Sequence, residues 1–174
     1  MGLAPAPCNP GKMIARLRAM LSTGDFAATP ERGGGNVDDE KWQHVVSSQP
    51  HAAPPLAFSV VICAYSLDRW DDLRDAIASL QDQTVLPHET IVVIDHNDDL
   101  LKRVRERFPA ILAIPNGGTQ GLSGARNTGV LAASGDVVAF LDDDARADAT
   151  WLEHFREHYL RANVLGVGGA VRPD

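Results

Sequence analysis

The most regular pattern in the sequence begins at residue 56, where short apolar runs alternate with amphipathic segments. The run FSVVICAY (58–65) is continuously apolar and rich in β-branched residues, which predicts a strand buried on both faces. Three further strands are predicted at TIVVID (90–95), ILAI (111–114) and DVVAFLD (136–142). The run VLGVGGAV (164–171) predicts a fifth strand near the end of the chain.

Helical spacing of apolar residues fills the intervals between these runs. In the first interval Trp70, Leu73, Ile77 and Leu80 form one stripe, as on a helix that covers a sheet. We expect Ser123 to cap the third helix and Asp148 the fourth, because both types of side chain accept backbone N–H groups at helix starts. The predicted helices span 69–83, 98–108, 121–134 and 149–160.

Alternation of strand and helix predicts the fold class. Right-handed crossovers between successive strands give an α/β, Rossmann-like domain, with a mostly parallel sheet and helices on both faces. In such a sheet ligands bind outside the carboxyl ends of the strands. The residues that directly follow each strand are therefore the first candidates for a site.

The first 55 residues have a different composition. Pro and Gly are concentrated there, which favours extended chain, so we expect 1–55 to be a loosely ordered leader and 56–174 to be the folded domain. KMIARLRAML (12–21) has a helical apolar face beside basic residues. It is either a membrane-surface or partner-binding helix, or a short marginal helix without such a role.

Composition and charge restrict the function. The chain of 174 residues is 44% hydrophobic and 22% charged, as in soluble globular domains, and its net charge is -7. Without a long basic run, nucleic acid is excluded as an expected partner. Two cysteines in dissimilar contexts do not indicate a disulfide, which fits a cytoplasmic location. No apolar run reaches the ~20 residues of a membrane-spanning helix.

Polar residues follow three of the predicted strands. Ala64, Tyr65 and Ser66 follow the first, and Asp95 follows the second. The fourth ends in Asp142, Asp143 and Asp144, three like charges whose nearest basic residue in the sequence is Arg146. Asp142 and Asp144, two positions apart, are expected to point the same way and Asp143 elsewhere. Carboxylates in this arrangement suit Mg²⁺ or Mn²⁺, although aspartates at strand ends also cap helices or remain solvated.

A glycine-rich segment, NGGTQGLSGARNTG (116–129), precedes the fourth strand. Its glycines allow close backbone approach near a helix start, where free amides attract anions. It has neither the Gly-Lys-Ser/Thr of a phosphate-binding Walker loop nor the dinucleotide fingerprint. Taken alone, such a segment is more often an ordinary turn than a binding loop.

Four segments together resemble a known family. SVVICAYS, IVVIDHN, NGGTQGLSGARNTG and GDVVAFLDDDA, in this order, resemble the nucleotide-sugar-binding half of inverting family-two glycosyltransferases with the GT-A fold. The resemblance covers roughly residues 56–174. It implies a nucleotide-diphosphate-sugar donor, by default a UDP-sugar, and a divalent cation, Mg²⁺ or Mn²⁺.

The resemblance also implies roles for individual residues. Tyr65, flanked by Ala64 and Ser66, would lie against the nucleotide base, and Asp95 would accept a hydrogen bond from it. Asp142 would lie near the ribose and take part in the metal site with Asp144, which would hold the metal. The remaining residues implied to border the donor are Gly121, Arg126, Asn127 and Asp143. For Arg126 three interpretations stay open: contact with phosphate, a pair with a rim aspartate, or a buried structural ion pair.

The resemblance does not supply a catalytic base within these residues. In the family, the base and the acceptor-binding region follow the segment matched here. We therefore expect the domain to be truncated at its C-terminus, with the base beyond Asp174, and the chain by itself to have little transfer activity. The implied acceptor is a carbohydrate or a lipid-linked acceptor, which allows peripheral association with the inner face of a membrane.

Two alternatives from other functional classes remain. One is a non-catalytic α/β module that binds a nucleotide without turnover. The other is an Mg²⁺-dependent phosphotransfer domain, whose aspartate nucleophile would need a lysine at a neighbouring strand end, where the sequence has none.

Overall fold

The described part of the chain comprises residues 56–161 and 164–172 of a computed structural model. It contains one four-stranded sheet in the order β3-β2-β1-β4, with parallel pairing throughout. The expectations for 1–55, including a helix at 12–21, lie outside the described residues. The strands are β1 (Phe58–Ala64), β2 (Glu89–Ile94), β3 (Leu112–Pro115) and β4 (Val137–Asp142).

Strand order reverses beside β1. The chain moves outward from β1 to β2 and β3, then returns to place β4 on the opposite side of β1. Crevices at such reversals are where open α/β sheets bind ligands. The crossovers between strands contain the helices α2 (Trp70–Gln81), α3 (Asp98–Arg107) and α4 (Leu122–Ala132). A short 3₁₀ helix, η2 (Leu67–Arg69), precedes α2, and α5 (Trp151–Tyr159) follows β4.

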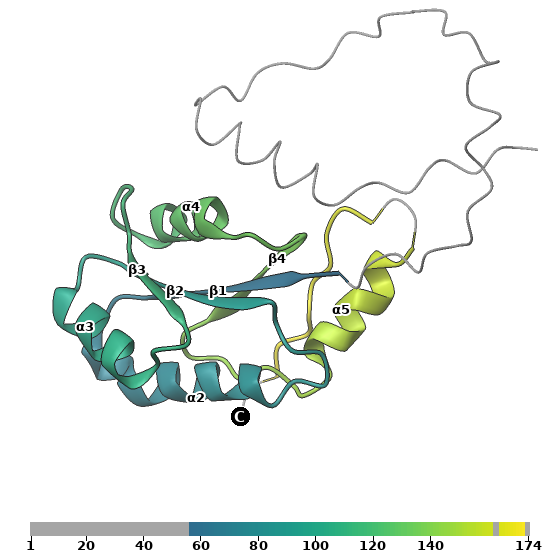
Figure 1. Cartoon of the computed structure of the whole chain (residues 1–174), viewed down its shortest axis with the longest axis horizontal. Coiled ribbons are helices and arrows are strands. Elements are labelled where there is room, and N and C mark those ends of the chain that lie inside the picture. Colours follow the sequence, from purple (N-terminus) through teal and green to yellow (C-terminus); the bar gives the residue numbers. More distant parts are fainter. Residues whose placement is uncertain (1–55, 162–163, 173–174) are drawn as a thin grey trace, which may run out of the picture.

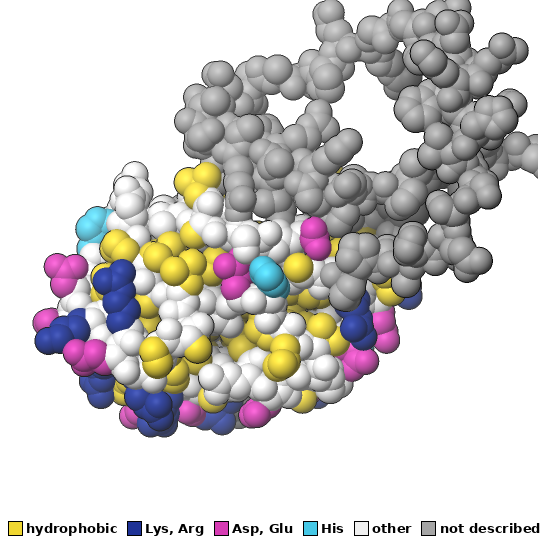
Figure 2. All heavy atoms as spheres, viewed as in Figure 1, with side chains coloured by type: hydrophobic (Ala, Val, Ile, Leu, Met, Phe, Trp, Pro, Cys, Tyr) yellow, Lys and Arg dark blue, Asp and Glu magenta, His cyan; other side chains and the backbone are white. Residues whose placement is uncertain are grey.

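Helices cover both faces of the sheet, as predicted. Figure 1 shows α4 above the sheet and α2 and α3 below it. Alternate residues of β1 point to the two sides: Val60 and Ile62 pack with α2 and α3, whereas Val61 packs with α4. α5 adds Leu152 and Phe155 to the larger cluster. Lys and Arg side chains, interspersed with Asp and Glu, line the margin over α2 and α3 (Figure 2).

The predicted apolar stripes are confirmed as the buried faces of the helices. Leu73, Ile77 and Leu80 of α2 are each about 1% exposed, and Trp70 packs at the edge of the same cluster. Asn97 caps α3 by accepting the amide of Leu100 at 3.0 Å. Burial of these stripes is what holds short helices in place, because helices of this length are marginal alone.

The predicted strand at 164–171 is wrong. Residues 164–172 are irregular and mostly exposed, and they pair with no strand of the sheet. Gly166, Gly168 and Gly169 lack side chains to pack and leave the backbone too free for a strand. Val167 nevertheless packs against the core, so this segment lies on the domain without joining the sheet.

Both predicted helix caps are also wrong in detail. The N-cap of α4 is Gly121, whose φ of 114° only glycine adopts readily, and Ser123 is the second residue of the helix. The N-cap of α5 is Thr150. Asp148 instead forms a turn before α5, where its carboxylate accepts the amide and the hydroxyl of Thr150 at 3.0 and 2.8 Å.

No helix of the described residues is both long and apolar enough to span a membrane.

Candidate functional site

The candidate site lies where the carboxyl ends of the four parallel strands meet. Pairing between β1 and β2 aligns Ala64 with Ile94, and pairing between β1 and β4 aligns Cys63 with Asp142. The amide of Asp95 donates to the Ala64 carbonyl at 2.8 Å, which continues the sheet by one residue. The polar ends predicted from separate segments therefore lie at one edge of the sheet, here called the rim.

Asp95 is the most firmly held residue of the rim. One carboxylate oxygen, Oδ1, accepts Asn116 Nδ2 at 2.7 Å and contacts His96 Nδ1 at 2.8 Å, and Oδ2 accepts the amide of Gly121 at 2.8 Å. Burial opposes the charge, yet these hydrogen bonds more than offset it and lower the pKa of Asp95 below its ordinary value. Asp95 is therefore a fixed, ionised acceptor, with only 11% of its side chain exposed.

Asn116 organises this part of the rim, and the sequence prediction missed it. Its side chain uses all four hydrogen-bonding positions: it donates to Asp95 and to the Thr119 carbonyl, and it accepts the Gly118 amide and the Thr128 hydroxyl. The residue is 8% exposed. A signal was available, because Asn116 directly follows the third strand, where the other three strands place their polar groups.

The glycine-rich segment forms a tight loop between β3 and α4. At Gly121 the left-handed backbone turns the amide toward Asp95. At Gly124 a Cβ atom would lie 1.8 Å from the Thr119 carbonyl oxygen, so no other residue fits without moving the loop. The predicted close approach of the backbone is confirmed: the loop packs closely against other parts of this chain, at Thr119 and Asp95.

The end of β1 presents one aromatic side chain to solvent. Tyr65 is 58% exposed, while its carbonyl accepts Asn97 Nδ2 at 3.0 Å and so is held in place. Ala64 is buried, and its contribution to the rim is the carbonyl that Asp95 uses. Ser66 is occupied as the cap of η2, where its hydroxyl oxygen accepts the Asp68 amide at 3.1 Å.

The three consecutive aspartates are divided between two arginines. Asp142 pairs with Arg126 of α4 at 3.1 Å. Asp143 pairs with Arg69 at 2.9 Å, and Asp144 hydrogen-bonds to the other terminal nitrogen of the same guanidinium. Asp142 and Asp144 thus have different partners, and the chain turns after β4, where Ala145 donates back to the Asp142 carbonyl.

Arg146, the nearest basic residue in the sequence, pairs with Asp75 of α2 instead. The charges that offset the repulsion among the aspartates come from 16 and 75 residues away. Sequence proximity gave the wrong counter-ion, because the turn after β4 directs Arg146 toward α2.

Asp143 is the buried member of the three. Only 6% of its side chain is exposed, and its Oδ2 atom has no hydrogen-bond partner among the described residues. Burial raises the pKa of Asp143, and the neighbouring aspartates add to this, while Arg69 acts in the opposite direction. Asp142 and Asp144 are open to solvent, with 64% and 48% of their side chains exposed.

The structure bears on two of the three interpretations of Arg126, the rim pair and the buried ion pair. The guanidinium pairs with the rim aspartate Asp142 and lies over the Phe140 ring, 5.4 Å from its centroid. With 40% of the side chain exposed, the pair is not a buried one. Asn127, the next residue, lies on the exposed side of α4 and makes no side-chain hydrogen bond within the described part of the chain.

Cys63 of β1 lies next to Asp142 of β4 in the sheet and packs on the face that α4 covers. Burial and the neighbouring carboxylates raise the pKa of its thiol to about 11, against a smaller opposing effect of Arg126. The thiol is therefore protonated at neutral pH and a poor nucleophile.

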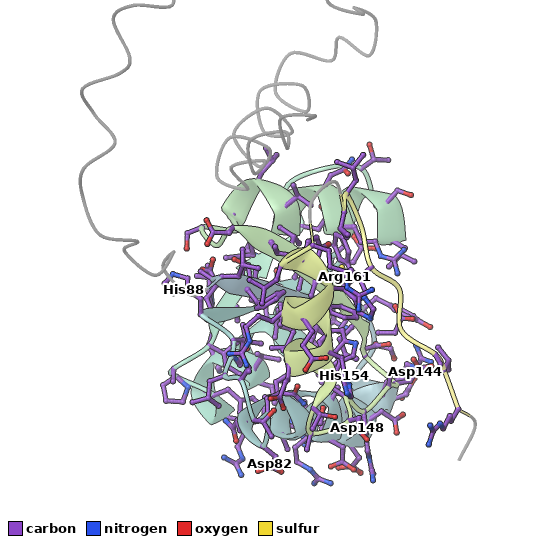
Figure 3. All side chains as sticks on the ribbon, turned by 90° about the vertical axis from the view of Figure 1, so that its right-hand side faces the viewer. Asp82, His88, Asp144, Asp148, His154 and Arg161 are labelled. Carbon is purple, nitrogen blue, oxygen red and sulfur yellow. The ribbon has the colours of Figure 1, made fainter. Side chains whose placement is uncertain are left out.

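The donor atoms at the rim suit a hard cation. Asp142 and Asp144 offer exposed carboxylate oxygens, and Mg²⁺ commonly takes one or two carboxylates and completes its shell with water and phosphate. Among the described residues no group of three or more His, Cys, Asp or Glu side chains is arranged so that it could hold a metal ion. The residues thus fit a cation shared with a phosphorylated ligand better than a closed protein cage. Asp144, with 48% of its side chain exposed, is labelled in Figure 3.

A parallel α/β sheet with a carboxylate-lined rim at its switch point defines a class of proteins that bind nucleotides or related ligands there. Comparison with known families is more specific. Residues 59–173 match the family described as glycosyl transferase family 2. The chain therefore belongs to this family, as the sequence resemblance predicted.

Several relatives have been named. Over 123 residues the chain is 36% identical to a glucosyl-dolichyl phosphate glucuronosyltransferase of Haloferax volcanii. This match covers 68% of this chain and 39% of that protein. Over 120 residues it is 33% identical to an uncharacterized glycosyltransferase of Nostoc, and this match covers 64% of this chain and 35% of that protein. The chain thus spans between a third and two fifths of these relatives. A solved structure of residues 1–349 of TarS from S. aureus is 22% identical, with a TM-score of 0.48; the match covers 59% of this chain and 32% of that one.

Proposed function

We propose that this chain forms the donor-binding half of a glycosyltransferase that uses a nucleotide-diphosphate sugar, by default a UDP-sugar. The single observation that carries the proposal is the rim itself, in a chain that belongs to glycosyl transferase family 2. There Asp95 is a fixed, ionised acceptor and Tyr65 an exposed aromatic ring, beside the open carboxylates of Asp142 and Asp144.

Each rim residue would make one kind of contact with the donor. The exposed ring of Tyr65 offers a flat apolar surface for the nucleotide base. Asp95 has lone pairs left after its three intramolecular hydrogen bonds, so it can accept an N–H of the base. Because its lowered pKa keeps it ionised at neutral pH, this acceptor needs no deprotonation before binding.

The phosphate end of the donor would lie toward β4. Asp144, with Asp142 near the ribose, would hold Mg²⁺ or Mn²⁺. When bound, such a cation offsets the negative charge that develops on a nucleoside-diphosphate leaving group. Arg126 is half-exposed beside Asp142, so its guanidinium is available at the same edge. Gly121 keeps the loop backbone close to Asp95.

The acceptor half of the reaction belongs to the same proposal. An acceptor hydroxyl, activated by a carboxylate base, attacks the anomeric carbon from the face opposite the leaving group and inverts its configuration. None of the rim residues is assigned as this base. The name of the Haloferax volcanii relative, a glucosyl-dolichyl phosphate glucuronosyltransferase, supports a lipid-linked acceptor, and so a location at the inner face of a membrane.

Calorimetric titration with UDP, with and without Mn²⁺, tests the donor site directly. We expect wild-type protein to bind UDP in the presence of Mn²⁺, and Asp144→Ala to lose most of the Mn²⁺ dependence. Glu106→Gln, an exposed carboxylate of α3, is the matched control and should bind as wild type does. Failure of wild type to bind UDP under both conditions would refute the proposal. Binding without any sugar transfer is the result expected of a donor-binding half by itself, and a non-catalytic module would give it too.

A further inference from the structure

Arg69 contacts two carboxylates at once, and neither contact is part of the proposed donor binding. Arg69 directly precedes α2, just after the end of β1, and its two terminal nitrogens contact the two successive aspartates that follow β4, Asp143 and Asp144. A planar guanidinium can hold two carboxylates in this way because its N–H groups have a fixed fork geometry. The contact thus joins the β1 end of the rim to the β4 end.

The two arms differ in burial. The Asp143 carboxylate is 6% exposed and lies 2.9 Å from Nη1, so this arm is an internal ion pair and an anchor. The Asp144 carboxylate is 48% exposed, and Nη2 contacts an oxygen that would otherwise be available to a ligand. Oδ2 of Asp143 has no partner in the described structure, so Arg69 is the only cation offsetting that buried charge there.

We propose that Arg69 is a positioning residue that acts as an internal counter-ion and competes with a divalent cation for the Asp144 carboxylate. The inference rests on the proposed function in that it takes Asp144 to be the metal-binding carboxylate. When the cation is bound, the Arg69–Asp144 contact opens, while the Arg69–Asp143 ion pair persists and keeps the guanidinium at the rim. Without the cation, the arginine offsets the repulsion between the adjacent carboxylates of Asp143 and Asp144 in the folded domain.

Competition has a measurable consequence. Removing Arg69 frees Asp144, so the affinity for the cation alone should rise, even though the folded domain loses a contact. A residue with a merely structural role would have the opposite effect, because a less ordered rim binds a cation more weakly. The direction of the change in Mn²⁺ affinity therefore separates the two roles.

The variants must leave Asp143 without a buried unpaired charge. Arg69→Gln alone would strand that carboxylate, so the test compares Asp143→Asn with the double variant Arg69→Gln/Asp143→Asn. Binding of Mn²⁺ alone is measured from the electron paramagnetic resonance signal of free Mn²⁺, and folding is checked by thermal unfolding. We expect the double variant to bind Mn²⁺ about threefold to tenfold more tightly than Asp143→Asn, as suits an ion pair of moderate exposure.

Arg146→Gln is the matched control, because it removes the same charge from a nearby arginine that pairs with Asp75 instead. It should change Mn²⁺ affinity by less than twofold. Equal or weaker binding by the folded double variant would overturn the inference, and so would an equal gain in Arg146→Gln. If wild type shows Mn²⁺-dependent UDP binding while the double variant shows no gain, only this inference fails. Absence of Mn²⁺ binding in all proteins, with and without UDP, refutes both the metal-dependent donor site and the competition.

Discussion

Individual residues at the rim work through hydrogen bonds that join separate segments. Asn116 shows this most directly, because its amide connects the end of β3 to Asp95, to its own loop and to α4. A buried amide with every position used is costly to alter, since any change leaves partners unsatisfied. The conformation of Asp95 therefore depends on a residue 21 positions away.

Asn116→Asp should destabilise the domain by about 2–4 kcal/mol at neutral pH. The substitution keeps the shape of the side chain but removes both N–H donors and places a second carboxylate beside Asp95. Urea unfolding measures the loss, which should shrink below about pH 5 as the carboxylates become protonated. Thr128→Val, which removes one hydroxyl donated to Asn116, is the control and should cost about 1 kcal/mol. Equal losses in both variants would contradict this account.

At the scale of elements, close packing of α4 on β1 sets how near the helix lies to the sheet at the rim. Gly129 of α4 faces Val61 of β1, and a Cβ atom added at Gly129 would lie 2.4 Å from the Val61 Cγ1 atom. The helix can approach the sheet only because this side chain is absent. α4 carries Arg126 and follows Gly121, so its position also sets theirs.

Gly129→Ala should destabilise the domain by about 1–3 kcal/mol, because it overpacks this contact. In an unconstrained helix the same change would stabilise by about 1 kcal/mol, so the sign tests the packing argument. The control is the double variant Gly129→Ala/Val61→Ala, in which the smaller side chain at Val61 makes room. Its loss in urea unfolding should be smaller than the sum of the two single losses. Additive losses would show that the two residues do not clash.

At the scale of the whole domain, polar contacts at the opposite edge of the sheet hold distant segments together. The Oε1 atom of Glu89, the first residue of β2, accepts the Ser59 hydroxyl at 2.6 Å and both the amide and hydroxyl of Ser134. Partial burial would raise the pKa of Glu89, yet these hydrogen bonds outweigh it and lower the pKa below its ordinary value. The Glu89 carboxylate thus joins β2 to β1, through Ser59, and to the segment before β4, through Ser134.

A lowered pKa in the folded state makes the contribution of Glu89 depend on pH. The stabilisation is fully present above the ordinary pKa of about 4.3 and is lost as pH falls through the lower folded value. Glu89→Gln should therefore cost about 1–3 kcal/mol at pH 7, and less at pH 3. Urea unfolding at several pH values measures this. Glu106→Gln on α3, 4.0 Å from Lys102, should show little cost at either pH. A cost for Glu89→Gln that is independent of pH would contradict the assignment.

Much of the architecture follows from local pattern. The four strands and the buried helix faces are where the spacing of apolar residues placed them, and alternation of strand with helix gave the parallel sheet. The failures have local causes as well. The run at 164–171 is apolar, but its glycines and the lack of a pairing strand keep it irregular. At Gly121 backbone conformation, rather than a capping side chain, starts the helix.

The sequence by itself determined the fold class, the family resemblance and the edge of the sheet where the chemistry lies, because these depend on periodicity and on which residues end each strand. The tertiary structure decided which groups at that edge meet. It paired Asp142 with Arg126, gave Asp143 and Asp144 to Arg69 and fixed Asp95 through Asn116. Such pairs join residues 16 to 75 positions apart, and only the folded chain brings charges at those separations within hydrogen-bonding distance.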